Sequence, residues 1–145
     1  MIKTTYEEEL NRNGRFTYTN VGVSMLPLLR QGRDMFTVEK KSGRCRKYDV
    51  VLFKRPPASY VLHRVVKVRE NDYVILGDNC LNKEYGIKDE DILGVMTAFV
   101  RNGKEYRINH KGYRIYSAVW YFLYPLRRLW MKFRILCRKI LRKNR

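Results

Sequence analysis

The stretch YVLHRVVKVRENDYVIL, residues 60–76, predicts two antiparallel strands joined by a tight turn. Residues 60–69 and 73–76 are rich in β-branched and aromatic side chains, which favour strands. Asn71 and Asp72 between them are residues that turns prefer, because their short side chains bond to nearby backbone. We therefore expect a β-hairpin near the middle of the chain.

Further short segments with strand-like composition flank this hairpin. They are residues 15–20, 34–40, 49–54, 92–100 and 105–108. The dipeptide Asn102-Gly103 between the last two is the strongest hairpin signal in the chain. Because these segments follow one another at hairpin spacing without helices between them, the sequence predicts a mostly β fold, built as a coiled antiparallel sheet or open barrel.

A helix is expected at each end of the chain. Residues 4–13 have acidic side chains in the first turn, Thr4 or Thr5 as the cap and Gly14 as the stop. Near the C-terminus, residues 126–141 place apolar side chains at helical spacing, with Lys and Arg on the other face.

The net charge of +17 is unevenly distributed along the chain. Residues 113–145 contain ten Lys or Arg and no Asp or Glu, whereas residues 1–112 have a net charge of +7. We therefore divide the chain into a domain of residues 1–112 and a C-terminal basic amphipathic helical segment of residues 113–145. Such a basic tail suggests an anionic partner, either membrane lipid or nucleic acid.

An anionic membrane surface is the favoured partner of this tail. Its apolar part, residues 115–126, is too short to span a membrane. We expect that part to pack on the sheet through Trp120, Phe122 and Leu123, and the helix after Pro125 to lie on the bilayer surface. Nucleic acid is disfavoured, because the sequence has no recognition motif, zinc finger or paired aromatic platform for bases.

The cysteine pattern gives no sign of a metal site. Cys45, Cys80 and Cys137 are odd in number and far apart, with no C-x-x-C pair and no Cys/His ligand spacing. We therefore predict neither a metal nor another cofactor. A reduced compartment is the simpler interpretation, and one disulfide remains the alternative.

Two residues have the chemistry of a nucleophile and its base. Ser24 lies in the small-residue turn of residues 21–27, where its own backbone N–H and the backbone near Gly22 are candidate oxyanion donors. His63 lies in a predicted strand, and an imidazole with an ordinary pKa near 6.5 is largely neutral at pH 7 and can accept a proton. A turn serine and a packed strand histidine are the alternatives. His110 is interpreted as a loop histidine.

The order of several segments resembles the signal peptidase I family and its self-cleaving, LexA-like repressor relatives. The segments are VGVSMLP (21–27), YDVVLF (48–53), HRV (63–65), GDN (77–79) and ILGV (92–95). The resemblance runs from about residue 21 to residue 99, and the His-Arg-Val box is closest to the archaeal and endoplasmic-reticulum type. It implies that Ser24 is the nucleophile and His63 the general base, on a fold of the signal peptidase/LexA-like type.

The third catalytic position departs from the family pattern. His-type enzymes have an aspartate shortly after the Gly-Asp-Asn turn, and the corresponding position holds Glu84. A glutamate can orient an imidazole, but its longer side chain requires a different backbone distance. Asp78 and Asp89 are the alternatives, and Asp78 is equally typical of a turn aspartate that bonds nearby backbone.

The sequence thus predicts a serine endopeptidase that cleaves a leader or signal-like segment of a precursor polypeptide after a small residue. A self-cleaving regulator is a weaker alternative, because only 23 residues precede Ser24 and they contain no Ala-Gly or Cys-Gly dipeptide. A non-catalytic adaptor that binds membrane or nucleic acid is the other alternative.

The expected location is peripheral, on the cytoplasmic face of the cell membrane. The N-terminus lacks the basic-then-apolar pattern of a secretory signal, and the basic tail favours the inner leaflet. The outer face is the alternative.

Overall fold

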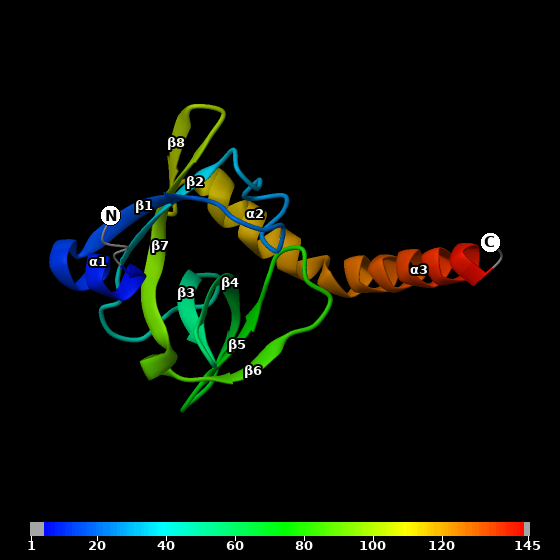
Figure 1. The fold of residues 1–145 in the computed structure, drawn as a ribbon, viewed down its shortest axis with the longest axis horizontal. Helices are drawn as coiled ribbons and strands as arrows, with labels where there is room; N and C mark the ends of the chain where they lie inside the picture. Colours follow the sequence, from blue (N-terminus) through cyan, green and yellow to red (C-terminus); the bar gives the residue numbers. More distant parts are fainter. Residues whose placement is uncertain (1–4, 144–145) are drawn as a thin grey trace.

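The computed structural model describes residues 5–143, which form an eight-stranded antiparallel sheet with three α-helices (Figure 1). The strands are β1 (Arg15–Thr19), β2 (Met35–Lys40), β3 (Val50–Arg55), β4 (Ser59–Val68), β5 (Tyr73–Leu76), β6 (Glu84–Ile87), β7 (Ile92–Arg101) and β8 (Lys104–Arg107). The helices are α1 (Tyr6–Asn13), α2 (Lys111–Phe122) and α3 (Tyr124–Lys143), and a 3-10 turn η1 covers Asp89–Asp91. The prediction of a mostly β, antiparallel fold is confirmed.

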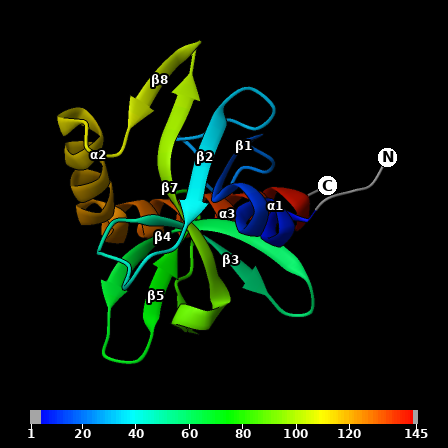
Figure 2. The same cartoon turned by 90° about the vertical axis from the view of Figure 1, so that its left-hand side faces the viewer.

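The long strand β7 joins the two halves of the sheet. The strand order is β1-β2-β7-β3-β4-β5-β6, and β8 pairs with the C-terminal half of β7. β7 therefore pairs with β2 along one edge and with β3 and then β8 along the other. In Figure 2, β7 runs from the half that contains β1, β2 and β8 to the half that contains β3, β4 and β5. Irregular pairing in β2 and β3 accompanies this bend, and the sheet stays open.

Local signals placed α1 and the central hairpin correctly. Thr5 caps α1 through a capping box with Glu8, and Gly14 ends the helix in the left-handed conformation, with φ of 72°. The alternative cap, Thr4, lies outside the described residues. The predicted hairpin is formed by β4 and β5, paired from Arg64 opposite Leu76 to Val68 opposite Tyr73.

Strand β6 was missed by the sequence analysis. Its sequence, Glu-Tyr-Gly-Ile, has no apolar alternation, and Gly86 has a φ of 74°. The strand exists because β5 offers a free edge, with Ile75 opposite Glu84. This pairing fixes the position of Glu84, which makes β6 important for the site.

A buried ion pair attaches α2 to the sheet. Arg64 on β4 and Asp78 after β5 are 1% and 2% exposed, and their side chains meet in two hydrogen bonds of 2.8 Å. Arg64 Nη1 also donates to Ser117 Oγ (2.7 Å) and to the Tyr113 hydroxyl (3.2 Å), both on α2. The Tyr116 hydroxyl donates to Asp78 Oδ2 (2.8 Å). Helix α2 thus supplies the polar groups that a buried charge pair requires.

Burial and the ion pair shift the pKa of Arg64 in opposite directions, and the effect of the ion pair is larger. Burial lowers the pKa of the guanidinium, but Asp78 and the Tyr113 hydroxyl raise it more, so its net direction is upward. For Tyr116, burial and then the Asp78 carboxylate both raise the pKa of the hydroxyl, which therefore keeps its proton. The cluster is a charged pair with neutral hydroxyls around it.

The face of α2 that packs on the sheet is polar and aromatic rather than aliphatic. Tyr113 and Ser117 are buried, whereas Phe122 is 81% exposed. The expectation that Phe122 packs on the sheet is wrong, because Arg64 and Asp78 select the hydroxyl-bearing face of the helix. Trp120 is half-buried, and its Nε1–H donates to the Asp78 carbonyl oxygen (2.9 Å) in the turn after β5.

Helix α3 leaves the body after its first turn and extends away from it (Figure 1). Its base is attached by Tyr124, whose hydroxyl donates to the Leu81 carbonyl oxygen (2.7 Å), and by Arg127, whose Nη1 donates to the Asp78 carbonyl oxygen (2.9 Å). Within residues 5–143, no helix is both long and apolar enough to cross a bilayer.

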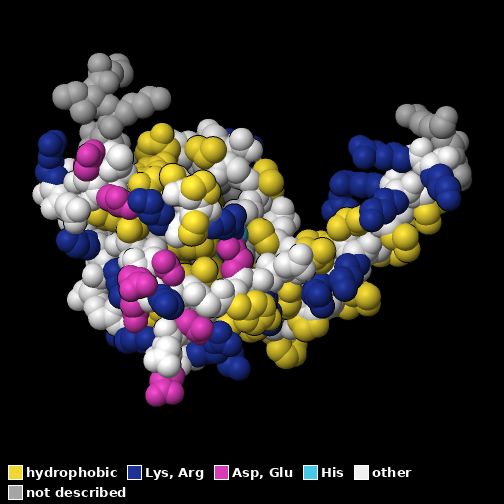
Figure 3. Space-filling model, turned by 60° about the horizontal axis from the view of Figure 1, so that its bottom comes forward, with side chains coloured by type: hydrophobic (Ala, Val, Ile, Leu, Met, Phe, Trp, Pro, Cys, Tyr) yellow, Lys and Arg dark blue, Asp and Glu magenta, His cyan; other side chains and the backbone are white. Residues whose placement is uncertain are grey.

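An apolar stripe runs along the exposed faces of α2 and α3. Its members follow one another at alternating steps of four and three residues, and all are exposed: Ile115, Val119, Phe122, Leu126, Leu129, Phe133, Leu136 and Ile140. In the view of Figure 3, Lys and Arg lie beside apolar side chains along α3, while Asp and Glu are seen on the body. The predicted basic amphipathic helix is therefore present, with its apolar face uncovered.

The buried ion pair gives a stability prediction. Asp78→Ala leaves the buried Arg64 without its counter-ion and should lower the free energy of unfolding by about 3–5 kcal/mol, measured by urea unfolding. Asp72→Ala is the matched control, because it removes the partner of Arg69 in a solvent-exposed pair and should change stability little. Similar losses for the two variants would contradict a structural role for Asp78.

Candidate active site

His63 and Glu84 form the best-defined contact of the site. His63 on β4 is 5% exposed, and its Nδ1 lies 2.9 Å from Oε1 of Glu84 on β6. A carboxylate accepts hydrogen bonds, so we assign the proton to Nδ1. Nε2 then carries the lone pair on the opposite side of the ring, where Cys80 Sγ lies 3.8 Å away.

Burial and neighbouring charges act on the pKa of His63 in opposite directions. Burial lowers it, Glu84 raises it, and the positive charge of Arg55 lowers it; the net direction is below the ordinary value of 6.5. The ring is therefore neutral at pH 7. Its basic form is lost only as the pH falls through this lowered pKa.

Arg55 at the end of β3 holds the Glu84 carboxylate in place. Its Nη2 lies 2.6 Å from Oε1 and its Nε 3.2 Å from Oε2 of Glu84. The guanidinium thus orients the carboxylate that orients the imidazole. The sequence analysis missed Arg55, because an arginine before a Pro-Pro turn carries no local signal of this contact.

The serine loop between β1 and β2 is tied to the Gly-Asp-Asn turn. The Asn79 N–H donates to the Ser24 carbonyl oxygen (2.8 Å), and Asn79 Nδ2 donates to the Val23 carbonyl oxygen (3.1 Å). On the other side of the loop, Asn20 Nδ2 donates to the Gly22 carbonyl oxygen (3.2 Å). Two boxes that are 55 residues apart in sequence, at Ser24 and Asn79, are therefore in direct contact.

Gly77 lies where the His63 ring and the serine loop approach each other closely. A Cβ at this position would lie 2.9 Å from His63 Nε2, 2.9 Å from the Ser24 carbonyl oxygen and 2.5 Å from Cys80 Sγ. No side chain fits between these atoms. Glycine is required because the imidazole and the serine backbone occupy the space on either side.

The predicted nucleophile and base line the same cavity. This cavity has a volume of about 720 Å³, and Ser24, His63, Cys80 and Glu84 are part of its wall. Within residues 5–143 the structure records no hydrogen bond between Ser24 Oγ and His63. Their direct contact stays a prediction, since catalytic hydrogen bonds often form only when substrate is bound.

The candidate oxyanion donors lie on the same loop. The Ser24 N–H has no acceptor among the described residues, which leaves it free to meet a developing negative charge. Gly22 has a φ of 87°, and its carbonyl oxygen accepts a hydrogen bond from Asn20 Nδ2. Their assignment as oxyanion donors also stays a prediction.

The two alternative acids are occupied elsewhere. Asp78 is bonded to Arg64 and Tyr116 beneath α2. Asp89 accepts from the Tyr73 hydroxyl (2.6 Å) and pairs with Lys41 (2.9 Å) at the far end of β5. Of the three candidate acids, Glu84 is the one in contact with His63.

Cys80 is a second nucleophile-type side chain in the cavity. Its Sγ lies 3.8 Å from His63 Nε2, and it is a free cysteine. Burial and then the nearby Glu84 raise the pKa of the thiol, so it stays protonated at neutral pH. The sequence signal was its position next to the Gly-Asp-Asn box. Among the described residues, no group of three or more His, Cys, Asp or Glu could hold a metal ion.

Comparison of the chain with models of protein families, with curated proteins and with solved structures finds no match. The resemblance to signal peptidases therefore rests on the sequence boxes. What the structure adds is the contact between His63 and Glu84, and the shared cavity with Ser24.

The charges around His63 predict that two substitutions shift its pKa in opposite directions. Glu84→Gln removes the carboxylate that favours the imidazolium and should lower the pKa of His63 further. Arg55→Gln removes a positive charge and should raise it. NMR titration of the ring resonances measures both shifts. The second histidine, His110, accepts from the Gly112 N–H at the start of α2 and serves as the internal control. Shifts of the same sign would contradict the assigned arrangement.

Proposed function

We propose that this protein is a serine endopeptidase of the signal peptidase/LexA-like type. The observation that carries the proposal is the neutral, buried His63, held by Glu84 at Nδ1, with Nε2 beside the serine loop. This is the arrangement that a general base for a serine nucleophile requires.

The placement of the sequence boxes on the strands supports this type of fold. The serine box lies in the loop between β1 and β2, and residues 48–53 lead into and form β3. The His-Arg-Val box lies on β4, the Gly-Asp-Asn box follows β5, and residues 92–95 open β7. The boxes that carry the chemistry converge on one cavity, although residues 21–95 span half of the chain.

In the proposed reaction, Ser24 Oγ attacks the carbonyl carbon of the scissile bond, and His63 Nε2 takes the hydroxyl proton. Glu84 stabilises the imidazolium that forms, and Arg55 fixes the position of Glu84. The Ser24 N–H, with backbone near Gly22, meets the oxyanion. The imidazolium then gives its proton to the leaving amine, and water hydrolyses the acyl-enzyme with His63 again as base.

The free edge of β4 is a suitable place for the substrate backbone. β5 pairs with β4 only from Arg64 onward, so residues 59–62 have β3 on one side and no strand on the other. Residues 60–62 also line the cavity with Ser24. An extended peptide can add to such an edge through main-chain hydrogen bonds. We infer that the substrate is an extended leader or signal-like segment, cleaved after a small residue such as alanine.

Cleavage by the Ser24–His63 pair is tested with a peptide library and three alanine variants. Ser24→Ala and His63→Ala should each reduce cleavage by at least about 10³-fold, because both act in one unit. Cys80→Ala should keep most of the activity, since its protonated thiol is a weak nucleophile. Ser42→Ala, in an exposed loop, is the matched control.

Three results would contradict this proposal or its substrate. Loss of activity in Cys80→Ala with retention in Ser24→Ala would make the protein a thiol peptidase. Absence of any cleavage, together with membrane binding, would favour a non-catalytic adaptor. Preference for a large or charged residue at the cleaved position would contradict the proposed substrate.

We further propose that α3 binds an anionic membrane surface, such as the inner leaflet of the cell membrane. The uncovered stripe from Ile115 to Ile140 offers the apolar face, and the Lys and Arg of α3 offer the charge. A second copy of the chain is a less suitable partner, because two helices without acidic residues would repel each other. The cytoplasmic location rests on this preference for anionic lipid.

Membrane binding of this kind depends on salt. The full-length protein should sediment with vesicles that contain phosphatidylglycerol, and binding should weaken as salt rises, because ions screen the charges. Vesicles of phosphatidylcholine alone are the control and should bind less. Equal binding to both lipids at all salt concentrations would contradict an electrostatic contribution.

A further inference from the structure

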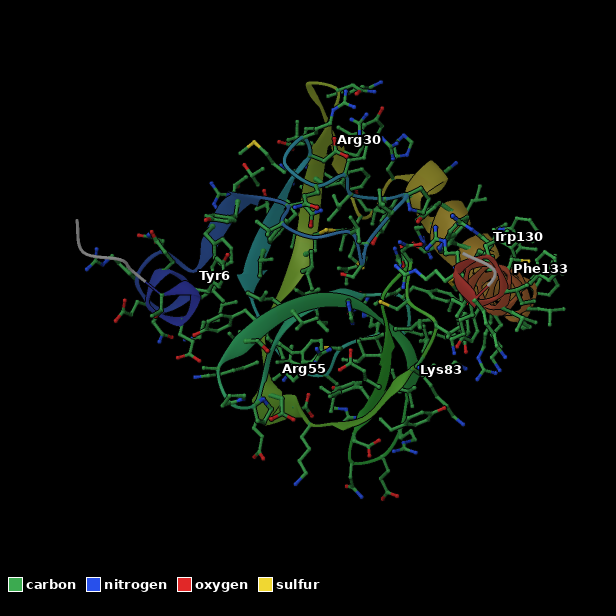
Figure 4. All side chains as sticks on the ribbon, turned by 45° about the vertical axis from the view of Figure 1, so that its right-hand side comes forward. Tyr6, Arg30, Arg55, Lys83, Trp130 and Phe133 are labelled. Atoms are coloured by element: carbon green, nitrogen blue, oxygen red, sulfur yellow. The ribbon has the colours of Figure 1, made fainter. Side chains whose placement is uncertain are left out.

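A second cavity lies where the body meets the junction of α2 and α3, and we call it the junction cavity. It has a volume of about 650 Å³. Four cationic side chains line it, two from the body and two from α3: Lys47, Lys83, Arg128 and Lys132. Among the described residues, no acidic side chain lines it. Figure 4 places Lys83 beside the helical arm, on the body side, while Trp130 and Phe133 point away from the body.

Aromatic rings hold the two body lysines at this cavity. Lys83 Nζ donates to the Tyr121 hydroxyl (3.0 Å) and lies 5.3 Å from the centre of the Tyr121 ring. Lys47 Nζ lies 5.5 Å from the same ring and 5.1 Å from that of Tyr48. The hydrogen bond to Tyr121 raises the pKa of Lys83, which therefore keeps its charge. Two cations thus share one aromatic ring, and charge repulsion between them favours an anion at this place.

The rim of the junction cavity is apolar. Phe122 and Leu129 line it and are 81% and 66% exposed, and both belong to the stripe along α2 and α3. A ligand that fits has a compact anionic group next to an apolar part. Free phosphate satisfies the cations but leaves Phe122 and Leu129 in water.

We propose that the junction cavity binds the phosphate of an anionic phospholipid headgroup, with the acyl chains against Phe122 and Leu129. This inference rests on the proposed membrane association of α3 and gives it a specific site. Charge complementarity and the apolar rim favour a lipid over a soluble phosphate ester.

A lipid at this position would lie close to the candidate active site. Lys83 lines the junction cavity and also the cavity of Ser24 and His63, and it precedes Glu84 in the chain. A bound headgroup therefore holds the mouth of the active-site cavity at the membrane surface. Segments that emerge from the bilayer are the substrates that this placement serves.

The test compares two pairs of substitutions on the same helix. Arg128→Gln with Lys132→Gln removes two cations of the junction cavity, and Lys139→Gln with Arg142→Gln removes two cations further along α3. Both double variants lose the same charge from exposed positions. Binding of the full chain to phosphatidylcholine vesicles that contain phosphatidylglycerol is measured by sedimentation at fixed salt.

The junction pair should weaken vesicle binding at least about fivefold more than the distal pair. Lys47→Gln, which changes the body and not α3, should also weaken binding about fivefold, and Phe122→Ser should weaken it as well. Equal losses for the two pairs, with no effect of Lys47→Gln, would show a general charge effect and overturn the junction site.

Competition experiments distinguish a lipid phosphate from a soluble phosphate as the ligand of the junction cavity. Soluble glycerol phosphate at millimolar concentration should not displace the protein from vesicles. Displacement by it, or by a short duplex DNA at lower concentration than vesicle lipid, would overturn the lipid assignment. Cleavage of a soluble peptide by these variants should match that of the unsubstituted chain, so a failure of the junction site is distinguishable from a failure of the peptidase proposal. If the unsubstituted chain binds no vesicles, the membrane proposal and this one both fail.

Discussion

The buried pair of Arg64 and Asp78 is the interaction on which the rest of the molecule depends. Charges at this depth need partners for every donor and acceptor, and α2 provides them through Tyr113, Tyr116 and Ser117. Both members of the pair also adjoin the site: Arg64 follows His63, and Asp78 follows Gly77. Because successive side chains of a strand point to opposite faces, Arg64 reaches α2 while His63 faces the cavity. One ion pair therefore links α2 to the strand that carries His63 and to the Gly-Asp-Asn turn.

The site obtains its order from contacts that cross the whole fold. β3 supplies Arg55, β4 supplies His63 and β6 supplies Glu84, while the serine loop is held by Asn79. None of these contacts is local in sequence. A chain with the same strands but a shifted register of β6 would lose the carboxylate from the imidazole, since Glu84 is fixed opposite Ile75. The geometry of the candidate site is thus a property of strand register as much as of residue identity.

Prediction from the sequence succeeded where the role of a residue depends only on its neighbours in the chain. Thr5 as a cap, Gly14 as a stop and the turn at residues 71–72 are such cases, and they placed α1 and the central hairpin. It failed where the outcome depends on a distant partner. Strand β6 was missed because it follows from the free edge of β5, although Glu84 on this strand was chosen by comparison with a family pattern. Phe122 was expected inside by its hydrophobicity, whereas the hydroxyl groups that Arg64 needs turned α2 the other way. Arg55 had no local signal at all.

Helix α3 has a mechanical consequence. It has 20 residues, so it is roughly 30 Å long, and its base is bonded to the body through Arg127 and Tyr124. A stiff rod that lies flat on a plane cannot tilt out of it, and a rod held with its apolar stripe against the plane cannot roll about its own axis, so whatever is fixed to its end keeps only the rotation within the plane. The body then keeps one height and one tilt above that plane. If α3 lies on a membrane surface as proposed, the helix sets the height of the candidate site, so a polypeptide rooted in that membrane would be met at a set number of residues from its point of emergence, whatever its sequence beyond that.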